Sequence, residues 1–114
     1  MGAKIQFIQG INEINIPRVK LTRSQNGTTG TATFLFTNSS LFNNESSKQG
    51  EITGMFLIDN EGILTTKDVN VRFKNGQPIN IEALYIMTNP TNWDRFMRFM
   101  ERYAKENGLT FIKK

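Results

Sequence analysis

The sequence predicts an α+β fold, a single-domain antiparallel β-sheet with one long C-terminal amphipathic helix packed across it. Several segments that alternate apolar and polar residues come first, and one helical pattern follows them. Asn-Gly pairs at 26–27 and 75–76 separate neighbouring segments as hairpin turns do. With 114 residues, 38% of them hydrophobic, the chain can bury one core, and no repeat or second domain interrupts residues 1–114.

The helix is expected between Asn89 and Gly108. Asn89 suits the N-cap, Pro90 suits the first helical position, and Gly108 suits a left-handed C-cap. At about 100° per residue, one face of this helix gathers apolar side chains, while Phe99 falls on its flank. The face consists of Trp93, Phe96, Met97, Met100, Tyr103 and Ala104. We interpret it as a core face, because an aromatic ligand box would need more than ordinary amphipathic spacing.

The opposite face of the helix is basic. It carries Arg95, Arg98, Arg102 and Lys105. Acidic residues four positions away predict ion pairs along the helix, namely Asp94–Arg98, Glu101–Lys105 and Arg102–Glu106. Two interpretations remain open for this face, a solvated ion-paired surface or a docking face for acidic protein or phosphate groups.

Residues 3–9 alternate as a first strand, and residues 10–17 form a connection. Segments 18–24 and 28–36 then flank Asn-Gly and predict a hairpin with a self-consistent register. One face pairs Leu21 with Ala32 and Val19 with Phe34, so it is apolar. The other face is polar and pairs Lys20 with Thr33 and Thr22 with Thr31.

The middle of the chain begins with a polar loop at 37–50, which is either a surface insertion or a binding loop. Residues 51–59 are apolar on both faces, as in a central strand, and Gly54 marks a bulge or a close helix approach. A turn at 60–62 leads into residues 63–74, which alternate as a strand.

A second hairpin is expected around Asn75-Gly76, between segments 63–74 and 79–87, and two registers are possible for it. A two-residue loop sets Phe73 opposite Pro78, whereas a three-residue loop sets it opposite Ile79 and keeps each face uniform. We therefore predict the three-residue loop 75–77, which also sets Val71 opposite Ile81 and Val69 opposite Ala83. The strand 79–87 feeds the helix, and residues 109–112 form a short extended tail.

Composition argues against an enzyme. The chain contains no Cys and no His, which excludes thiolate nucleophiles and Ser-His-Asp hydrolases and removes the commonest zinc and haem ligands. The scattered carboxylates of Glu51, Asp68 and Glu82 have no fixed geometry, and residues 59–62 lack the spacing of a calcium loop. We expect no metal and no cofactor.

The longest apolar run, residues 83–87, is far shorter than a membrane span, and residues 1–7 lack a signal-peptide core. Gln6 stands where an N-myristoylation motif needs Ser or Thr. We expect a protein that works in a reducing aqueous compartment, beside a membrane rather than in it.

The net charge of +4 and pI near 9.6 favour an acidic partner surface. Exposed ion pairs are weak, so we expect a partner strand to add to an open sheet edge in the 18–36 hairpin while basic side chains steer it. The expected partner-binding residues are Lys20, Thr22, Thr31, Thr33, Arg95, Arg98 and Arg102. The alternative is a small basic nucleic-acid-binding domain, which the placement of most Phe residues on core faces disfavours.

Four strings in the sequence are more specific than its general patterns. They are WDRFMRFMERYAKENGL at 93–109, GTATFLF at 30–36, EITGMFLID at 51–59 and NGQP at 75–78. Together they resemble shared stretches of the photosystem II reaction-centre Psb-twenty-eight (PsbW class two) protein family, and the likeness runs from about Lys4 to the end. Thr91 and Asn92 depart from the family's acidic residues after the helix-opening proline.

The resemblance implies a non-enzymatic accessory or assembly factor of photosystem II, linked with chlorophyll-protein biogenesis. Such proteins bind assembly or repair intermediates transiently, near the inner antenna and reaction-centre core subunits. They lie peripherally on the cytoplasmic or stromal face of the thylakoid membrane and carry no cofactor. The absence of an Arg-rich transit peptide favours a cyanobacterial or plastid-encoded chain.

Overall fold

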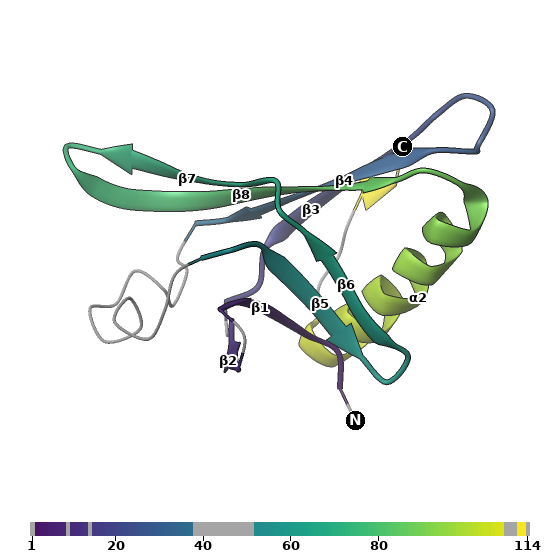
Figure 1. Cartoon of the computed structure of the whole chain (residues 1–114), viewed down its shortest axis with the longest axis horizontal. Coiled ribbons are helices and arrows are strands. Elements are labelled where there is room, and N and C mark those ends of the chain that lie inside the picture. The colour runs from purple at the N-terminus through teal and green to yellow at the C-terminus, as the bar shows by residue number, and fades with distance from the viewer. Residues whose placement is uncertain (1, 9, 14, 38–51, 109–111, 114) are drawn as a thin grey trace.

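The computed structural model describes residues 2–8, 10–13, 15–37, 52–108 and 112–113. These residues form two β-sheets and one helix (Figure 1). The first sheet has the strand order β2 (Ile11–Asn12), β1 (Lys4–Ile8), β5 (Met55–Asp59), β6 (Gly62–Thr66). The second has the order β7 (Val69–Lys74), β8 (Gln77–Met87), β4 (Gly30–Phe36), β3 (Arg18–Arg23), β9 (Ile112–Lys113). The helix α2 spans Pro90–Asn107, and the predicted α+β class is confirmed.

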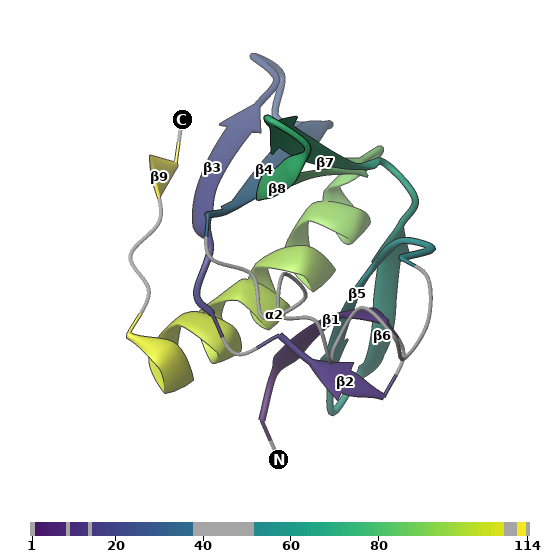
Figure 2. The ribbon, with the colours of Figure 1, turned by 90° about the vertical axis from the view of Figure 1, so that its left-hand side faces the viewer.

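The helix lies between the two sheets. Figure 2 shows α2 below the five-stranded sheet and beside the four-stranded one, and the helix contacts both β8 and β5. Phe7 from β1, Phe34 and Phe36 from β4 and Phe96 from α2 are all buried and meet in edge-on and stacked ring contacts. One core therefore joins both sheets to the helix.

The predicted helix ends are confirmed. The Asn89 side chain accepts a hydrogen bond from the N–H of Asn92 at 2.8 Å, and Gly108 has φ 69° and donates to the carbonyl of Ala104. Phe99 was expected on a flank, but it is fully buried and stacks on Tyr103 with ring centroids 5.8 Å apart. Because two sheets enclose the helix, its apolar arc is wider than a helix resting on one sheet would need.

The register of the first hairpin is also confirmed. β3 pairs with β4 so that Val19 opposes Phe34, Leu21 opposes Ala32 and Thr22 opposes Thr31. The two strands are joined by residues 24–29, where Gly27 has φ 73°. The Asn26 side chain holds this turn by accepting from the Ser24 and Thr28 hydroxyls at 2.8 Å each.

The stretch 63–74 is divided between the sheets, which the alternation did not predict. β6 pairs with β5, whereas β7 pairs with β8. At the crossing, the Thr66 hydroxyl donates to the carbonyl of Leu84 at 2.8 Å and thus links the two sheets. A Cβ at Gly54 would lie 2.5 Å from the Thr66 carbonyl oxygen, so the close approach at this glycine is to β6 backbone and not to the helix.

The second hairpin combines both registers considered for it. Val69 opposes Ala83 and Val71 opposes Ile81, as predicted, but a bulge follows and Phe73 opposes Pro78. The turn is therefore a two-residue one, with Asn75 at φ 54° and Gly76 at φ 78°. The three-residue loop was wrong because the bulge absorbs the extra residue.

The structure also bears on the predictions for residues 10–17, for β5 and for the polar loop and tail. Residues 10–17, expected as a plain connection, contain the two-residue strand β2, which pairs with β1. β5 is a central strand, as predicted. The polar loop, apart from Thr37, and residues 109–111 of the tail lie outside the described residues. Within the described part, no helix is both long and apolar enough to cross a membrane.

Candidate functional site

The four hairpin residues predicted to bind a partner lie together. Lys20 and Thr22 from β3 oppose Thr33 and Thr31 from β4. The alternate residues of both strands, Leu21 among them, are buried against the helix side, so these four share the outer face of the five-stranded sheet. Lys20 and Thr22 are exposed, and Thr31 and Thr33 are partly buried.

The expectation that this hairpin forms a free edge is wrong for β4. This strand lies between β8 and β3, so both of its backbone edges are already paired, including those of Thr31 and Thr33. β3 lies further out, and β9 pairs with it in parallel at Lys20 and Leu21 (Figure 2). The edge available in this hairpin is therefore the outer edge of β3, of which β9 covers the middle.

β3 carries three cations and no acidic residue. Arg18, Lys20 and Arg23 are all exposed. Arg18 and Lys20 make no ion pair with any described residue. Arg23 lies over the Trp93 ring, 4.6 Å from its centroid, and donates to the carbonyl of Gly27. The β3 edge is therefore positively charged without local neutralisation.

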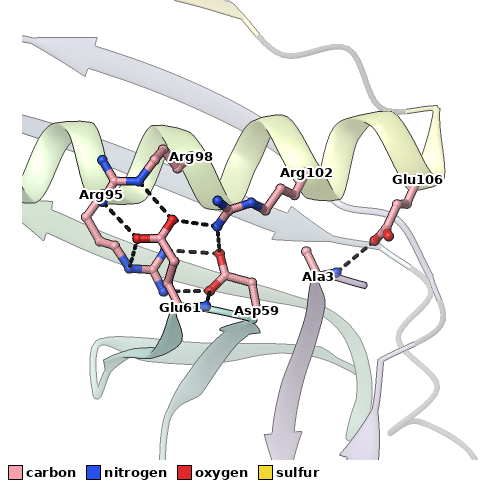
Figure 3. Close-up of polar contacts among 7 residues, drawn as sticks. All are labelled: Ala3, Asp59, Glu61, Arg95, Arg98, Arg102 and Glu106. Atoms are coloured by element: carbon pink, nitrogen blue, oxygen red, sulfur yellow. Dashed lines mark hydrogen bonds and ion pairs between the residues drawn. The ribbon is translucent and has the colours of Figure 1, made fainter. Parts of the chain in front are cut away.

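The three predicted helix arginines make different contacts. Arg95, Arg98 and Arg102 converge on the carboxylates of Asp59 and Glu61, at the turn between β5 and β6 (Figure 3). Arg95 donates to both oxygens of Asp59 at 2.7 and 3.0 Å, and Arg98 donates to both oxygens of Glu61 at 2.8 and 2.9 Å. The Nη1 atom of Arg102 lies between the two acids, 2.8 Å from Asp59 Oδ2 and 2.7 Å from Glu61 Oε2. We call these five residues the arginine cluster.

The three ion pairs predicted within the helix are absent among the described residues. Arg98 and Arg102 reach the β5–β6 turn instead. Glu106, expected to pair with Arg102, accepts the backbone N–H of Ala3 at 2.7 Å (Figure 3). Bidentate contacts between guanidinium and carboxylate groups are stronger than exposed pairs along a helix. The basic face of the helix is thus largely an internal contact between α2 and the four-stranded sheet.

The arginine cluster stays charged throughout the neutral range. Burial opposes ionisation of Asp59, but hydrogen bonds from Arg95 and Arg102 outweigh it and hold the pKa of Asp59 below its usual value. Hydrogen bonds from Arg98 and Arg102 lower the pKa of Glu61 to about 2. Contacts with these acids raise the pKa of Arg98 and of Arg102. Three cations and two anions leave the cluster with one surplus positive charge.

Sequence reasoning missed Asp59 and Glu61 as partners of the arginines, although part of the signal was present. Met55, Leu57 and Asp59 share one face of β5, and all three are buried. A carboxylate on a buried strand face needs a cation, so the pattern itself required one. Among the described residues, no three acidic side chains gather closely enough to hold a metal ion.

Comparisons with known proteins agree on one family. Residues 5–111 match a family described as Psb28 protein. A "Photosystem II reaction center Psb28 protein" from Phaeodactylum tricornutum is 61% identical over 113 residues, covering 99% of this chain and 98% of the relative. The protein of that name from Guillardia theta is 62% identical, covering 97% and 96% of the two chains.

A more distant match comes from a land plant. "Photosystem II reaction center PSB28 protein, chloroplastic" from Arabidopsis thaliana is 56% identical over 110 residues. These residues make up 96% of this chain and 60% of that protein. Matches of this length and identity show that the chain belongs to the Psb28 protein family.

Proposed function

We propose that the chain is a non-catalytic accessory factor of photosystem II. It binds assembly or repair intermediates from the cytoplasmic or stromal side of the thylakoid membrane, through their inner antenna and reaction-centre core subunits. The names of its relatives support the photosystem II association, and the name of the Arabidopsis relative places that protein in the chloroplast. The assembly stage and the side of the membrane are parts of the proposal that the family resemblance suggests.

The observation that carries the proposed mechanism is the outer edge of β3. It is a backbone edge with three cations and no acidic residue, and among the described residues β9 pairs with it at Lys20 and Leu21. Micromolar binding needs about 8 kcal/mol, whereas an exposed ion pair contributes roughly 0.2–1 kcal/mol. Affinity therefore comes chiefly from main-chain hydrogen bonds to an added partner strand, and the basic side chains steer and orient the encounter.

The polar outer face and the helix arginines have supporting roles in this proposal. Thr22, Thr31 and Thr33 form the surface beside the added strand. Arg95, Arg98 and Arg102 contribute the surplus charge of the arginine cluster to steering, while their guanidinium groups stay bound to the two acids.

The nucleic-acid alternative has no support in the comparisons. Stacking on bases needs exposed aromatic rings. Phe7, Phe34, Phe36 and Phe99 are buried, and Phe73, 63% exposed, stands at the far edge of the sheet from β3.

The test is a charge reversal on β3. We expect the double variant R18E/K20E to lose capture of core subunits from solubilised thylakoid membranes, measured by affinity purification and mass spectrometry. K67E/K74E is the matched control, because Lys67 and Lys74 are exposed cations outside β3 and the double reversal changes the net charge equally. Equal capture by R18E/K20E and the unchanged chain would overturn the β3 edge as the site. Failure of the unchanged chain to capture any core subunit would overturn the proposed function.

A further inference from the structure

We propose that the tip of the β7–β8 hairpin enters the interface of a lipid bilayer that carries anionic headgroups. The tip consists of residues 72–80. The inference rests on the membrane location in the proposed function and adds a direct contact with lipid. This contact is separate from the proposed binding of core subunits at the β3 edge.

The tip is an arm of two strands. β8 pairs with β4 from Met87 to Ile81 and no further, so among the described strands β7 is the one neighbour of β8 beyond Ile81. Figure 1 shows the hairpin extending away from α2, past the ends of β4 and β5. Its turn is tight, with φ 54° at Asn75 and 78° at Gly76, as in a type I′ turn. The arm therefore holds its end residues in a defined arrangement at the margin of the molecule.

The end of the arm exposes a contiguous apolar surface. Phe73 is 63% exposed, and it is the one exposed aromatic residue in the described part of the chain. It opposes Pro78, and Ile79, 42% exposed, follows Pro78 at the bulge. Val71 lies two residues before Phe73 on the same side of β7 and packs against the core. The apolar side of the hairpin thus continues beyond the core, as at surfaces that contact a protein or a membrane.

The charge of the arm favours an anionic surface. Residues 69–81 contain two cations, Arg72 and Lys74, and no acidic residue. Lys74 is exposed and makes no ion pair with any described residue, whereas Arg72 pairs with Glu82 at 3.2 Å in a solvent-exposed contact. Side chains alternate along β7, so both cations lie on the side opposite Phe73.

This separation of basic and apolar sides matches the chemistry of a membrane interface. Amphipathic helices with such sides lie in the interface, because apolar burial and attraction to anionic lipid act together. The same two forces act on an amphipathic hairpin. With Phe73 and Ile79 among the upper parts of the lipid chains, Lys74 lies at the level of the headgroups.

The shape of the arm favours lipid over a protein partner. A stable protein interface buries about 800 Å² on each side and involves about 20–30 residues. The arm spans only residues 72–80 and projects from the molecule, so it offers neither that area nor a concave surface. Lipids rearrange around a projection, so one aromatic and one aliphatic side chain can make a reversible contact there.

The first experiment measures binding of the full chain to vesicles by flotation. We expect binding to vesicles of phosphatidylcholine mixed with phosphatidylglycerol, and about 10-fold weaker binding to phosphatidylcholine alone. F73S/I79S should weaken binding to the mixed vesicles about 10-fold, because it removes the apolar contact. The matched control is I63S/I86S, which removes isoleucines that are 57% and 58% exposed, on β6 and at the end of β8 farthest from the turn. Circular dichroism spectra establish that both variants are folded.

A Trp at the tip reports insertion directly. The unchanged chain has one Trp, Trp93, which is 7% exposed and belongs to the core. In F73W, brominated phosphatidylcholine in the mixed vesicles should quench the added fluorescence, whereas the unchanged chain should show little quenching. I63W is the control, because it places a Trp at an exposed position of the other sheet.

The contribution of charge is tested at Lys74. K74E should weaken binding to the mixed vesicles several-fold and flatten its dependence on salt. K67E is the control, because Lys67 is exposed between β6 and β7, outside the arm, and its reversal changes the net charge equally. The same loss in K67E as in K74E would mean that net charge, and not the arm, attracts the vesicles.

The remaining outcomes separate lipid from protein contacts. Equal loss of vesicle binding in F73S/I79S and I63S/I86S, or equal quenching in F73W and I63W, would overturn the tip as the inserted element. Equal binding to both kinds of vesicle would overturn the anionic preference. If F73S/I79S leaves vesicle binding unchanged but loses capture of core subunits from solubilised membranes, the tip is a protein contact and the inference fails.

The inference and the proposed function can fail separately, because capture from solubilised membranes involves no bilayer. If the unchanged chain captures core subunits but binds no vesicles, the inference fails and the proposed function stands. If it binds vesicles through the tip but captures no core subunit, the proposed function fails and the lipid contact stands.

Discussion

Asp59 links the four-stranded sheet to the helix through a single buried carboxylate. Its side chain is fully buried, and each oxygen accepts from a guanidinium group, with Oδ1 also accepting the N–H of Glu61 at 3.0 Å. A buried charge is tolerated only when such partners satisfy it. The arginines in turn depend on Asp59, since the side chain of Arg95 is only 16% exposed.

Asp59→Asn should therefore be strongly destabilising. The substitution preserves the shape of the side chain but leaves Arg95 and Arg102 with one anion between them. We expect the free energy of unfolding to fall by about 3 kcal/mol, as when one partner of a buried ion pair is removed. Urea denaturation followed by circular dichroism measures this change.

The matched control for Asp59→Asn is Glu82→Gln, which removes one charge from the exposed pair of Arg72 and Glu82. That pair should contribute less than about 1 kcal/mol. Equal losses in the two variants would mean that burial does not distinguish the arginine cluster from a surface pair.

Single residues also show what the sequence could not reveal. The helical period placed Arg95 and Arg102 correctly on the side away from Trp93, but their partner Asp59 lies 36 and 43 positions away. Contacts over such separations depend on how the sheets are arranged, which local patterns do not encode. Phe99 was misjudged for the same reason, because its burial depends on how the helix packs between the two sheets (Figure 2).

At the scale of elements, Gly30 is a point of close approach between the helix and the five-stranded sheet. A Cβ on this residue would lie 2.4 Å from Cζ3 of Trp93, a residue that is 7% exposed and whose ring Arg23 covers. β4 thus needs a residue without a side chain where the first turn of α2 crosses it. The string at 30–36 begins with this glycine for a steric reason.

Gly30→Ala should force the Trp93 ring away from β4. We expect a loss of about 1–3 kcal/mol in the free energy of unfolding, the usual cost of overpacking a close contact. Trp93 is the only Trp in the chain, so its fluorescence emission reports the same displacement directly. Thr29→Ala, at an exposed neighbouring position, is the control. Unchanged stability and unchanged emission in Gly30→Ala would contradict this packing.

The β7–β8 hairpin shows where apolar pattern can determine register. Near the core, Val71 and Ile81 are paired as predicted, because a slip would expose buried side chains. At the tip, Phe73 and Ile79 are 63% and 42% exposed, so uniform faces carry little energetic advantage there. The prediction failed at the point where burial ends.

At the scale of the whole molecule, the sequence predicted the α+β class and the helix but not the division into two sheets. Alternation through 63–74 looks the same whether a strand continues or crosses to another sheet. At the crossing, Gly54 closely approaches the Thr66 backbone, and the Thr66 hydroxyl donates to the carbonyl of Leu84. Both contacts join separate segments of the chain, so local alternation does not encode them. The interior place of β4 and the pairing of β9 also depend on contacts between segments far apart along the chain, so the edge of the candidate site could not be predicted either.

The two acids that join the four-stranded sheet to the helix also predict how the whole molecule responds to acid. The pKa values of Asp59 and Glu61 are lowered from about 3.8 and 4.5, in the case of Glu61 to about 2. Groups with depressed pKa values in the folded state stabilise it above their unfolded values and lose that contribution as they become protonated. The free energy of unfolding should therefore be nearly constant above about pH 5 and decline between about pH 4.5 and pH 2.

Urea denaturation at a series of pH values measures this decline, and R98Q/R102Q tests its origin. Without these two arginines, the pKa of Glu61 returns toward its ordinary value, because they are the source of its main hydrogen bonds. The variant should be less stable at neutral pH and should lose less stability on acidification than the unchanged chain. R72Q is the control, because Arg72 pairs with Glu82 on the exposed face of the other sheet and should leave the acid slope largely intact. Parallel pH profiles for R98Q/R102Q and the unchanged chain would show that acid sensitivity arises outside the arginine cluster.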